Sequence, residues 1–306
     1  MEKEMKQEAL KLLWLLEQHQ EEGRLVGGCV RDEQLGLTPN DYDIAATPEP
    51  ERTTTIMCQA GYKVIPTGIR HGTIGVLTPL GIIEVTTLRR DVSTDGRHAQ
   101  VRFSRDFEED ATRRDFTINA LYEDRHGHIY DFFGGLTHLR EKRLVFVGDA
   151  AQRIQEDYLR ILRCFRFQAR FGLEVDPGAL IAIGADKDGL TRLSWERVQH
   201  EIWSFLACET VSVGLAAMIE LSVIPLILPQ VNWAELNDLP ALWDEHAGLS
   251  SLLPETRLGL ALLMAGITAP AEIDEFCRSL RCSNRQRDQM ITLICGYKIL
   301  VNLARA

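Results

Sequence analysis

Two adjacent glycines stand between a short apolar strand and a helical segment, and two aspartates follow closely. Leu25-Val26 leads into Gly27-Gly28-Cys29-Val30-Arg31-Asp32, and Asp41-Tyr42-Asp43 begins nine residues after the end of that motif. Glycine lets backbone N–H groups approach a phosphate closely, and a helix that starts there adds partial positive charge. Strand side chains at i and i+2 point to one side, so both aspartates are expected to share divalent metals. The pattern predicts an α/β unit that holds a nucleoside triphosphate beside a metal pair.

Length and composition exclude several classes of protein. The 306 residues exceed what one small core needs, which predicts two or more subdomains. The longest apolar run, around 215–231, is interrupted by a glutamate, a serine and two prolines, so no membrane span is expected. A net charge of −10 argues against nonspecific nucleic-acid binding by the whole surface, while clustered arginines leave room for a local basic cleft.

The cysteines and the N-terminus favour a cytoplasmic protein. The seven cysteines are scattered and form no CxxC pair, which is typical of reduced, mostly buried thiols. The start, Met1-Glu2-Lys3-Glu4, lacks the basic-then-apolar layout of a signal peptide.

Residue patterns predict an α/β head followed by a helical remainder. In the head we expect helices over 4–18, 29–36, from Thr47-Pro48 to about 59, and 107–119, with strands over 25–26, 41–45, 62–65, 73–77 and 82–88 and a hairpin over 121–130. The charged connection 89–105 is long for a compact domain, which indicates a functional loop. Later helices are expected over 149–170, 177–184, 195–207, 210–221, 255–266, 270–280 and 284–303.

The carboxylates suit nucleotidyl transfer. This chemistry needs positioning and charge neutralisation, which two Mg²⁺ ions held by carboxylates supply. Asp41 and Asp43 are the expected ligands, Glu84 is the candidate third carboxylate, and Arg31 is expected to bind phosphate from the first helical turn. A DxD pair alone is most often solvated charge, and a glycine pair alone is often a tight turn. The short spacing between the two motifs favours the functional interpretation.

At these residues the chain resembles the class II tRNA nucleotidyltransferases and bacterial poly(A) polymerases, which belong to the polymerase-β-like nucleotidyltransferase superfamily. The resemblance covers about residues 22–205. It continues, in matching order and spacing, through Thr67-Gly68-Ile69-Arg70-His71-Gly72-Thr73, Glu84-Val85-Thr86-Thr87-Leu88-Arg89, Asp95-Gly96-Arg97, Arg113-Arg114-Asp115-Phe116-Thr117-Ile118-Asn119-Ala120, Asp131-Phe132-Phe133-Gly134-Gly135 and Glu156-Asp157-Tyr158-Leu159-Arg160-Ile161-Leu162-Arg163.

The resemblance implies an α+β fold in three parts. These are a catalytic head of mixed sheet and helices over 1–138, an all-α neck that recognises the base over 139–208, and a helical body with a reduced tail that binds RNA over 209–306. It implies that Asp41 and Asp43 bind metal, and that Gly27-Gly28, Arg31 and Arg113-Arg114 lie near the triphosphate or ribose. The alternative for Arg113-Arg114 is an exposed pair on helix 107–119, with Asp115 orienting one of them.

Helix 149–170 offers a way to choose the base. Its apolar stripe, formed by Tyr158, Ile161, Leu162, Phe165 and Ala169, predicts the buried face. Asp157 and Arg160 lie off that face, three residues apart. The ordinary interpretation is a solvated ion pair contributing about 0.2–0.5 kcal/mol.

The chemistry of that pair allows a sharper interpretation. An aspartate beside an arginine presents an acceptor next to donors, which matches cytosine and adenine and opposes guanine and uracil. In the family this motif is the protein template for the incoming base, and Asp157 and Arg160 match it. Arg163 and Arg166 would then lie near the nucleotide or the RNA end.

Three hypotheses follow. The first is a tRNA nucleotidyltransferase that adds CCA to the tRNA 3′ end from CTP and ATP with Mg²⁺. The second is a related enzyme that adds only A, as one residue or as a poly(A) tail. The third is a non-catalytic RNA-binding protein that keeps the fold. Segment 89–105 matches the family's flexible loop, which favours CCA or A addition over CC addition. The sequence leaves the oligomeric state open.

Overall fold

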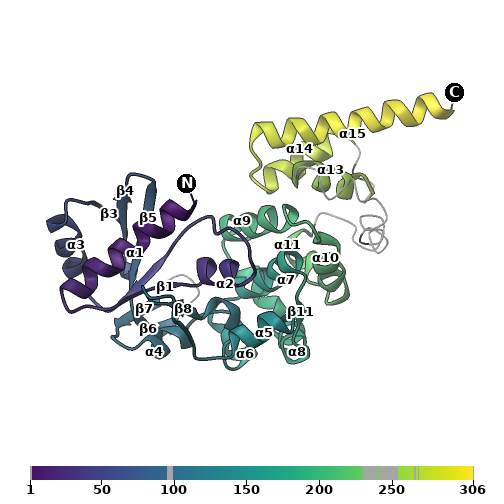
Figure 1. The fold of residues 1–306 in the computed structure, drawn as a ribbon. Helices are drawn as coiled ribbons and strands as arrows, with labels where there is room; N and C mark the ends of the chain where they lie inside the picture. Colours follow the sequence, from purple (N-terminus) through teal and green to yellow (C-terminus); the bar gives the residue numbers. More distant parts are fainter. Residues whose placement is uncertain are drawn as a thin grey trace. The chain divides into compact units, whose positions relative to one another are not determined.

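The computed structural model describes residues 2–94, 99–229, 254–264 and 269–305, with residues 240 and 267. It divides into two compact units, Met1–Asp157 and Tyr158–Ala306 (Figure 1). The first holds a mixed sheet with helices and the second is almost wholly helical, which confirms the predicted α+β class. The predicted boundaries at 138 and 208 stay predictions. No helix within the described ranges is long and apolar enough to cross a membrane.

A seven-stranded sheet in the order β3-β4-β5-β2-β1-β8-β9 forms the centre of the first unit. Its strands are β1 (Gly23–Val26), β2 (Ile44–Ala46), β3 (Lys63–Gly68), β4 (Thr73–Thr78), β5 (Gly81–Thr87), β8 (Leu121–Glu123) and β9 (Ile129–Asp131). Strands β2 and β5 run parallel, with Ile44 opposite Val85, and the other neighbours are antiparallel. This register brings Asp43, just before β2, beside Glu84 on β5.

Helices cover the strands of this unit. They are α1 (Glu2–Gln18), α2 (Gly28–Gln34), α3 (Pro50–Gln59), α4 (Phe107–Thr112), α5 (Gly135–Arg140) and α6 (Ala150–Glu156), with the 3₁₀ turns η1 (Ile69–His71) and η2 (Thr117–Asn119) and the short strand β10 (Arg143–Leu144). Helices α1 and α3 contact each other beside the strands (Figure 1). Leu12, Leu13 and Leu16 of α1 are fully buried, because their spacing gives the helix one apolar face.

Several elements of the head differ from their predicted form. Helix α3 begins at Pro50 and is not capped by Thr47, because the Thr47 hydroxyl is used elsewhere. This hydroxyl donates to Glu21 at 3.0 Å and accepts from the Glu22 N–H at 3.0 Å. The second strand begins at Ile44 instead of Asp41. The connection 89–105 contains a paired ribbon, β6 (Arg89–Thr94) with β7 (Ala99–Phe103), and 95–98 lie outside the described residues.

The end of helix 107–119 is also predicted wrongly, because α4 ends at Thr112. Beyond it the chain pairs with residues 145–147. The Thr117 N–H donates to the Val145 carbonyl at 2.9 Å, and the Val147 N–H donates to the Asp115 carbonyl at 3.0 Å. These long-range hydrogen bonds replace the helical ones.

The second unit contains α7 (Leu159–Phe171), β11 (Glu174–Val175), α8 (Pro177–Asp186), η3 (Lys187–Arg192), α9 (Trp195–Leu206), α10 (Val211–Glu220), α11 (Ile224–Ile227), α13 (Pro254–Met264), α14 (Pro270–Ser279) and α15 (Asn284–Arg305). The predicted helix 149–170 is two helices, because Asp157 is extended, with φ −156° and ψ 101°. Residues 265 and 266 of the predicted helix 255–266 lie outside the described residues.

Helix α7 is the core of the second unit. Its predicted buried face is confirmed at Ile161, Leu162, Phe165 and Ala169, whereas Tyr158 precedes the helix and is half-buried. Gly214 of α10 lies directly against it. A Cβ there would lie 2.8 Å from the Phe165 carbonyl oxygen and 2.7 Å from the Phe205 ring. Only glycine permits this close packing of α10.

We expect Gly214→Ala to lower the free energy of unfolding by about 1–3 kcal/mol, because the added methyl overpacks against backbone. Gly184→Ala on α8 is the matched control, because its new Cβ would meet only Leu221 at an ordinary 3.8 Å. Alanine's better helix propensity should raise stability there by up to about 1 kcal/mol. Urea unfolding followed by circular dichroism measures both. Equal stability of Gly214→Ala and the wild type would contradict the packing argument.

Candidate functional site

The turn between β1 and α2 is built from the two predicted glycines. Gly27 has φ +74°, a region that favours glycine, and its N–H donates to the Leu121 carbonyl at 3.0 Å. A Cβ on Gly27 would lie 3.2 Å from Nη1 of Arg114, and a Cβ on Gly28 would lie 3.7 Å from Nη2 of Arg31. The structure therefore brings two guanidinium groups from distant segments next to the glycine turn.

Arg31 is 4% exposed and has protein partners. Its Nε and Nη2 donate to Oδ1 of Asp32 at 2.8 and 2.6 Å, and its Nη1 donates to Oδ1 of Asn119. The Asn119 amide donates in turn to Asp115 at 2.9 Å. The Asp115 carboxylate therefore accepts from Asn119 and from the Phe116 N–H, and the hypothesis that it orients Arg113 or Arg114 stays a prediction. Direct phosphate binding by Arg31 stays a prediction.

A buried carboxylate that the sequence analysis missed, Asp110 of α4, holds the arginine pair. Its Oδ1 accepts from Arg113 Nε at 2.9 Å, and its Oδ2 accepts from Arg114 Nη2 at 3.2 Å and from the Tyr122 hydroxyl at 2.8 Å. The arginine side chains are only 17% and 18% exposed, so the alternative of an exposed pair is wrong. The signal was present, because Asp110 precedes the pair by three and four residues, the spacing of helical neighbours.

The charges of this cluster stabilise one another. Burial alone would raise the pKa of Asp110. The positive charges of Arg114 and Arg113 outweigh this effect, so the pKa of Asp110 lies below its usual value. Burial lowers the pKa of Arg114, but Tyr122 and Asp110 outweigh that effect and raise it. Both groups therefore stay ionised at neutral pH, and Arg114 keeps its positive charge next to the glycine turn.

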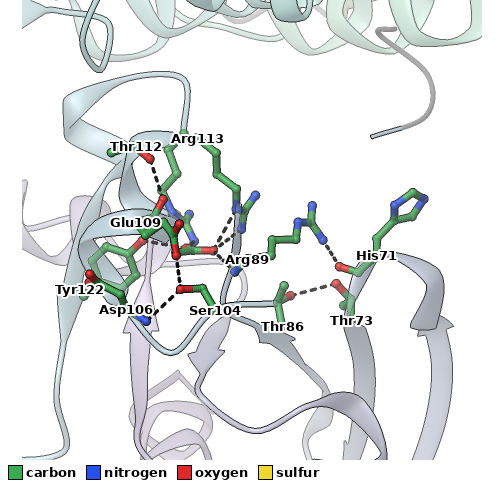
Figure 2. A network of polar contacts seen from close by, with 12 residues as sticks. His71, Thr73, Thr86, Arg89, Ser104, Asp106, Glu109, Thr112, Arg113 and Tyr122 are labelled. Atoms are coloured by element: carbon green, nitrogen blue, oxygen red, sulfur yellow. Dashed lines mark hydrogen bonds and ion pairs between the residues drawn. The ribbon is translucent and has the colours of Figure 1, made fainter. Parts of the chain in front are cut away.

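The same network fixes the start of the β6–β7 ribbon (Figure 2). The Arg89 N–H donates to Asp110 at 3.2 Å, and the Arg89 guanidinium donates to the His71 carbonyl. At the other end of the ribbon, the Ser104 hydroxyl donates to Glu109 of α4. The segment predicted to be a functional loop is thus anchored at both ends to elements around the arginine pair.

The predicted carboxylates lie on one exposed side. Asp41, Asp43 and Glu84 are exposed, whereas Tyr42 between the aspartates is 5% exposed. The pKa of Asp43 rises to about 6, first because surrounding protein displaces water from it and then because Glu84 and Asp41 repel its negative charge. Arg114 opposes the rise. The three carboxylates and Arg114 are therefore close enough to interact electrostatically.

This donor set suits a hard divalent cation. Because the pKa of Asp43 is raised by folding, its protonation adds to the free energy of unfolding. This contribution is fully present below pH 3.8 and is lost as the pH rises through about 6. A cation beside the ionised carboxylate offsets that loss. Among residues 2–94, 99–229, 254–264 and 269–305, no three His, Cys, Asp or Glu side chains form a ready metal group. Mg²⁺ commonly takes one or two carboxylates and completes its shell with water and substrate phosphates, so the carboxylates fit its chemistry.

The remaining predicted residues lie at or beyond the division between the units. Asp157 ends α6 and Arg160 lies in the first turn of α7, and both are half-buried. Because Asp157 is extended and precedes α7, the two residues do not share one helix, and the pairing of their side chains stays a prediction. Arg166 Nε lies 2.6 Å and Arg163 Nη1 3.7 Å from the carboxylate of Glu201 on α9.

Comparison with known proteins gives a consistent result. Residues 23–145 match the family model of the poly(A) polymerase head domain. The mitochondrial CCA tRNA nucleotidyltransferase 1 of Danio rerio is 36% identical over 292 residues, which are 94% of this chain and 66% of that protein. A CCA-adding enzyme of Streptococcus pyogenes serotype M2 is 38% identical over 249 residues, 81% of this chain and 58% of that protein.

Solved structures agree. The Bacillus stearothermophilus CCA-adding enzyme in complex with CTP superimposes with a TM-score of 0.84 at 30% identity, covering 95% of this chain and 69% of that one. The Thermotoga maritima CCA-adding enzyme complexed with tRNA_CCA shares the fold, with a TM-score of 0.70 at 18% identity, covering 96% and 70%. The chain spans 66% and 58% of the length of the two curated relatives above, less than two thirds of each.

We expect Asp110→Asn to lower the free energy of unfolding at pH 7 by about 3–5 kcal/mol, because buried arginines lose their counter-ion. The contribution of Asp110 is fully present above its ordinary pKa of 3.8 and is lost as the pH falls through its lower folded value. The difference in the free energy of unfolding between the variant and the wild type should therefore become smaller in acid. Urea unfolding at pH 7, 5 and 3.5 measures it.

Glu108→Gln on the same helix is the control, because Glu108 is exposed. Its effect should stay within about 0.5 kcal/mol. Similar losses in both variants would contradict the role given to Asp110.

Proposed function

The chain belongs to the tRNA nucleotidyltransferase and poly(A) polymerase family, and on this basis we propose that it adds the 3′-terminal CCA to tRNA from CTP and ATP. One observation carries the proposal. Arg114 lies against Gly27 of the glycine turn and also interacts electrostatically with Asp43, which Glu84 and Asp41 repel. Groups suited to a triphosphate and groups suited to a metal cation therefore meet at one place.

The head residues have distinct roles in the transfer. Nucleotidyltransferases generally use divalent metals, and a bound Mg²⁺ pair supplies the charge that activates the attacking 3′ hydroxyl and stabilises the leaving pyrophosphate. Asp41 and Asp43 would hold these ions, with Glu84 as the third carboxylate. The 3′ hydroxyl gives its proton to water, and its oxygen forms a bond to the α-phosphorus as the bond to pyrophosphate breaks. Gly27 and Gly28 let the backbone approach the triphosphate, and the arginines at positions 31, 113 and 114 offset its negative charge.

Base choice is assigned to Asp157 and Arg160. The carboxylate accepts from the exocyclic amino group of cytosine or adenine, and the guanidinium donates to the adjacent ring nitrogen. Guanine and uracil present the opposite pattern and are rejected. Arg163 and Arg166 both lie against the carboxylate of Glu201. Their proposed place near the nucleotide or the RNA end rests on the family resemblance.

The family resemblance also supports a second function, A addition alone. The ribbon β6–β7 keeps the segment that matches the family's flexible loop, which supports CCA or A addition over CC addition. A non-catalytic RNA-binding role is disfavoured, because RNA binding gives no reason to gather Asp41, Asp43 and Glu84 despite their repulsion. The cytoplasmic location stays a prediction, and several relatives are named mitochondrial proteins.

Primer extension on tRNA transcripts that end before CCA, after C and after CC tests the proposal. With Mg²⁺, CTP and ATP, we expect three, two and one additions that then stop. Addition of A to the CC-ended RNA alone would establish an A-adding specialist, and a long tail would establish a poly(A) polymerase. Asp43→Ala should abolish transfer while RNA binding is unchanged, because the metal ligand is lost. Full activity of this variant would contradict the metal assignment.

Arg160→Ala should reduce the preference for CTP over UTP by tenfold or more, because lost hydrogen bonds to a base are worth about 1–3 kcal/mol. The KM for CTP should change less than the base preference. Arg170→Ala, in the last turn of the same helix, is the control, because Arg170 is exposed and lies against Phe171. Single-nucleotide incorporation with each triphosphate measures the preference. If Arg160→Ala still discriminates like the wild type, the templating role is wrong.

A further inference from the structure

The segment that carries the two aspartates is held by the side chain between them. Asp41 and Asp43 are exposed, but Tyr42 is 5% exposed and points into the head, as strand-like alternation requires. The segment precedes β2, and its backbone is tied to β1 where the Val26 N–H donates to the Asp43 carbonyl at 3.0 Å. The buried ring of Tyr42 adds a side-chain attachment on the opposite side from the carboxylates.

The hydroxyl of Tyr42 belongs to a charged cluster that joins three elements. It donates to Oε1 of Glu33 at 2.8 Å, while Lys6 Nζ donates to Oε2 of Glu33 at 2.5 Å and to Oε1 of Glu123 at 2.9 Å. Lys6 comes from α1, Glu33 from α2 and Glu123 from β8. We call these four residues the Tyr42 anchor.

The anchor is electrostatically stable. Burial lowers the pKa of Lys6, but hydrogen bonds and charge attraction from Glu33 and Glu123 outweigh it, so the pKa is raised. Glu33 is 21% and Glu123 8% exposed, so their attraction to Lys6 is only partly screened. Lys6 therefore fixes Glu33 as an acceptor for Tyr42.

The position of Glu33 gives the anchor its significance. Helix α2 begins at the glycine turn and also carries Glu33 near its end. The hydrogen bond from Tyr42 to Glu33 thus joins the element that forms the glycine turn to the segment that carries Asp41 and Asp43. A short helix is stiff, so this bond limits how far the carboxylates can shift relative to the turn.

We propose that Tyr42, acting through Glu33 and Lys6, is a positioning residue that fixes Asp41 and Asp43 relative to the glycine turn. The inference rests on the proposed function, because it takes the two aspartates as metal ligands. Tyr42 itself contacts neither substrate nor metal. Loss of its hydroxyl should loosen the metal ligands while leaving the groups that meet RNA unchanged.

The test is Tyr42→Phe, which removes one hydroxyl and keeps the ring. The Mg²⁺ concentration for half-maximal transfer should rise about tenfold, the effect of losing one hydrogen bond to a charged group. At saturating Mg²⁺, kcat and the KM for tRNA should stay within about twofold, because bound metal restores the geometry. Mn²⁺ affinity, measured by electron paramagnetic resonance on the full chain without RNA, should fall by a similar factor.

The chain offers a matched control in Tyr62→Phe. The Tyr62 hydroxyl also donates to a glutamate of α1, Glu8 at 3.4 Å, which pairs with Lys11, but this cluster does not reach the aspartate segment. The Mg²⁺ concentration for half-maximal transfer and the Mn²⁺ affinity of Tyr62→Phe should match those of the wild type. Glu33→Gln keeps an acceptor for Tyr42 and should weaken Mn²⁺ binding less than Glu33→Ala. This pair also serves if Tyr42→Phe does not fold.

Equal Mn²⁺ affinity in Tyr42→Phe, Tyr62→Phe and the wild type would overturn the positioning role. A wild type that binds no Mn²⁺ would overturn it as well. A wild type that binds Mn²⁺ but adds no nucleotide would remove the proposed function, and the Mn²⁺ affinities of the variants would still decide whether Tyr42 positions the aspartates.

Discussion

The Asp110 carboxylate is the interaction on which the candidate site depends. Both of its oxygens are used, one by Arg113 and the other by Arg114 and Tyr122, and the Arg89 backbone adds a further donor. A buried charge is tolerated only with such complete partnering. The hydrogen bonds of Asp110 therefore hold α4, β8 and the start of β6 together. They also fix the positively charged Arg114 next to the glycine turn.

The carboxylates on the other side of the site repel one another instead of being paired with arginines. Asp43 is flanked by Glu84 and Asp41, and its pKa is raised, whereas that of Asp110 is lowered. The head thus contains a satisfied carboxylate that organises the arginines and an unsatisfied one that a cation would stabilise. A site for a metal and a triphosphate requires this difference. If every carboxylate of the head were already paired with an arginine, no negative charge would be left to bind the metal.

Sequence patterns predicted most elements, and the two main failures are helices that were predicted too long. Helices such as 4–18, 195–207 and 284–303 were correct within a few residues, because an amphipathic period is local. The helix expected over 107–119 ends at Thr112, where hydrogen bonds to residues 145–147 take over, and the helix expected over 149–170 breaks at Asp157. In the first case distant partners outweighed local propensity, which no window of neighbouring residues can reveal.

The sequence by itself determined the fold class, the glycine turn, the aspartate pair and the family, because these depend on spacing along the chain. Only the tertiary structure decided how the side chains are partnered. Arg31 meets Asn119, 88 residues away, and Lys6 meets Glu123, 117 residues away. Tyr42, which lies between the two aspartates in the sequence, donates to Glu33 on another element. Such contacts depend on which strands the sheet sets side by side, and that order arises from the packing of the whole head.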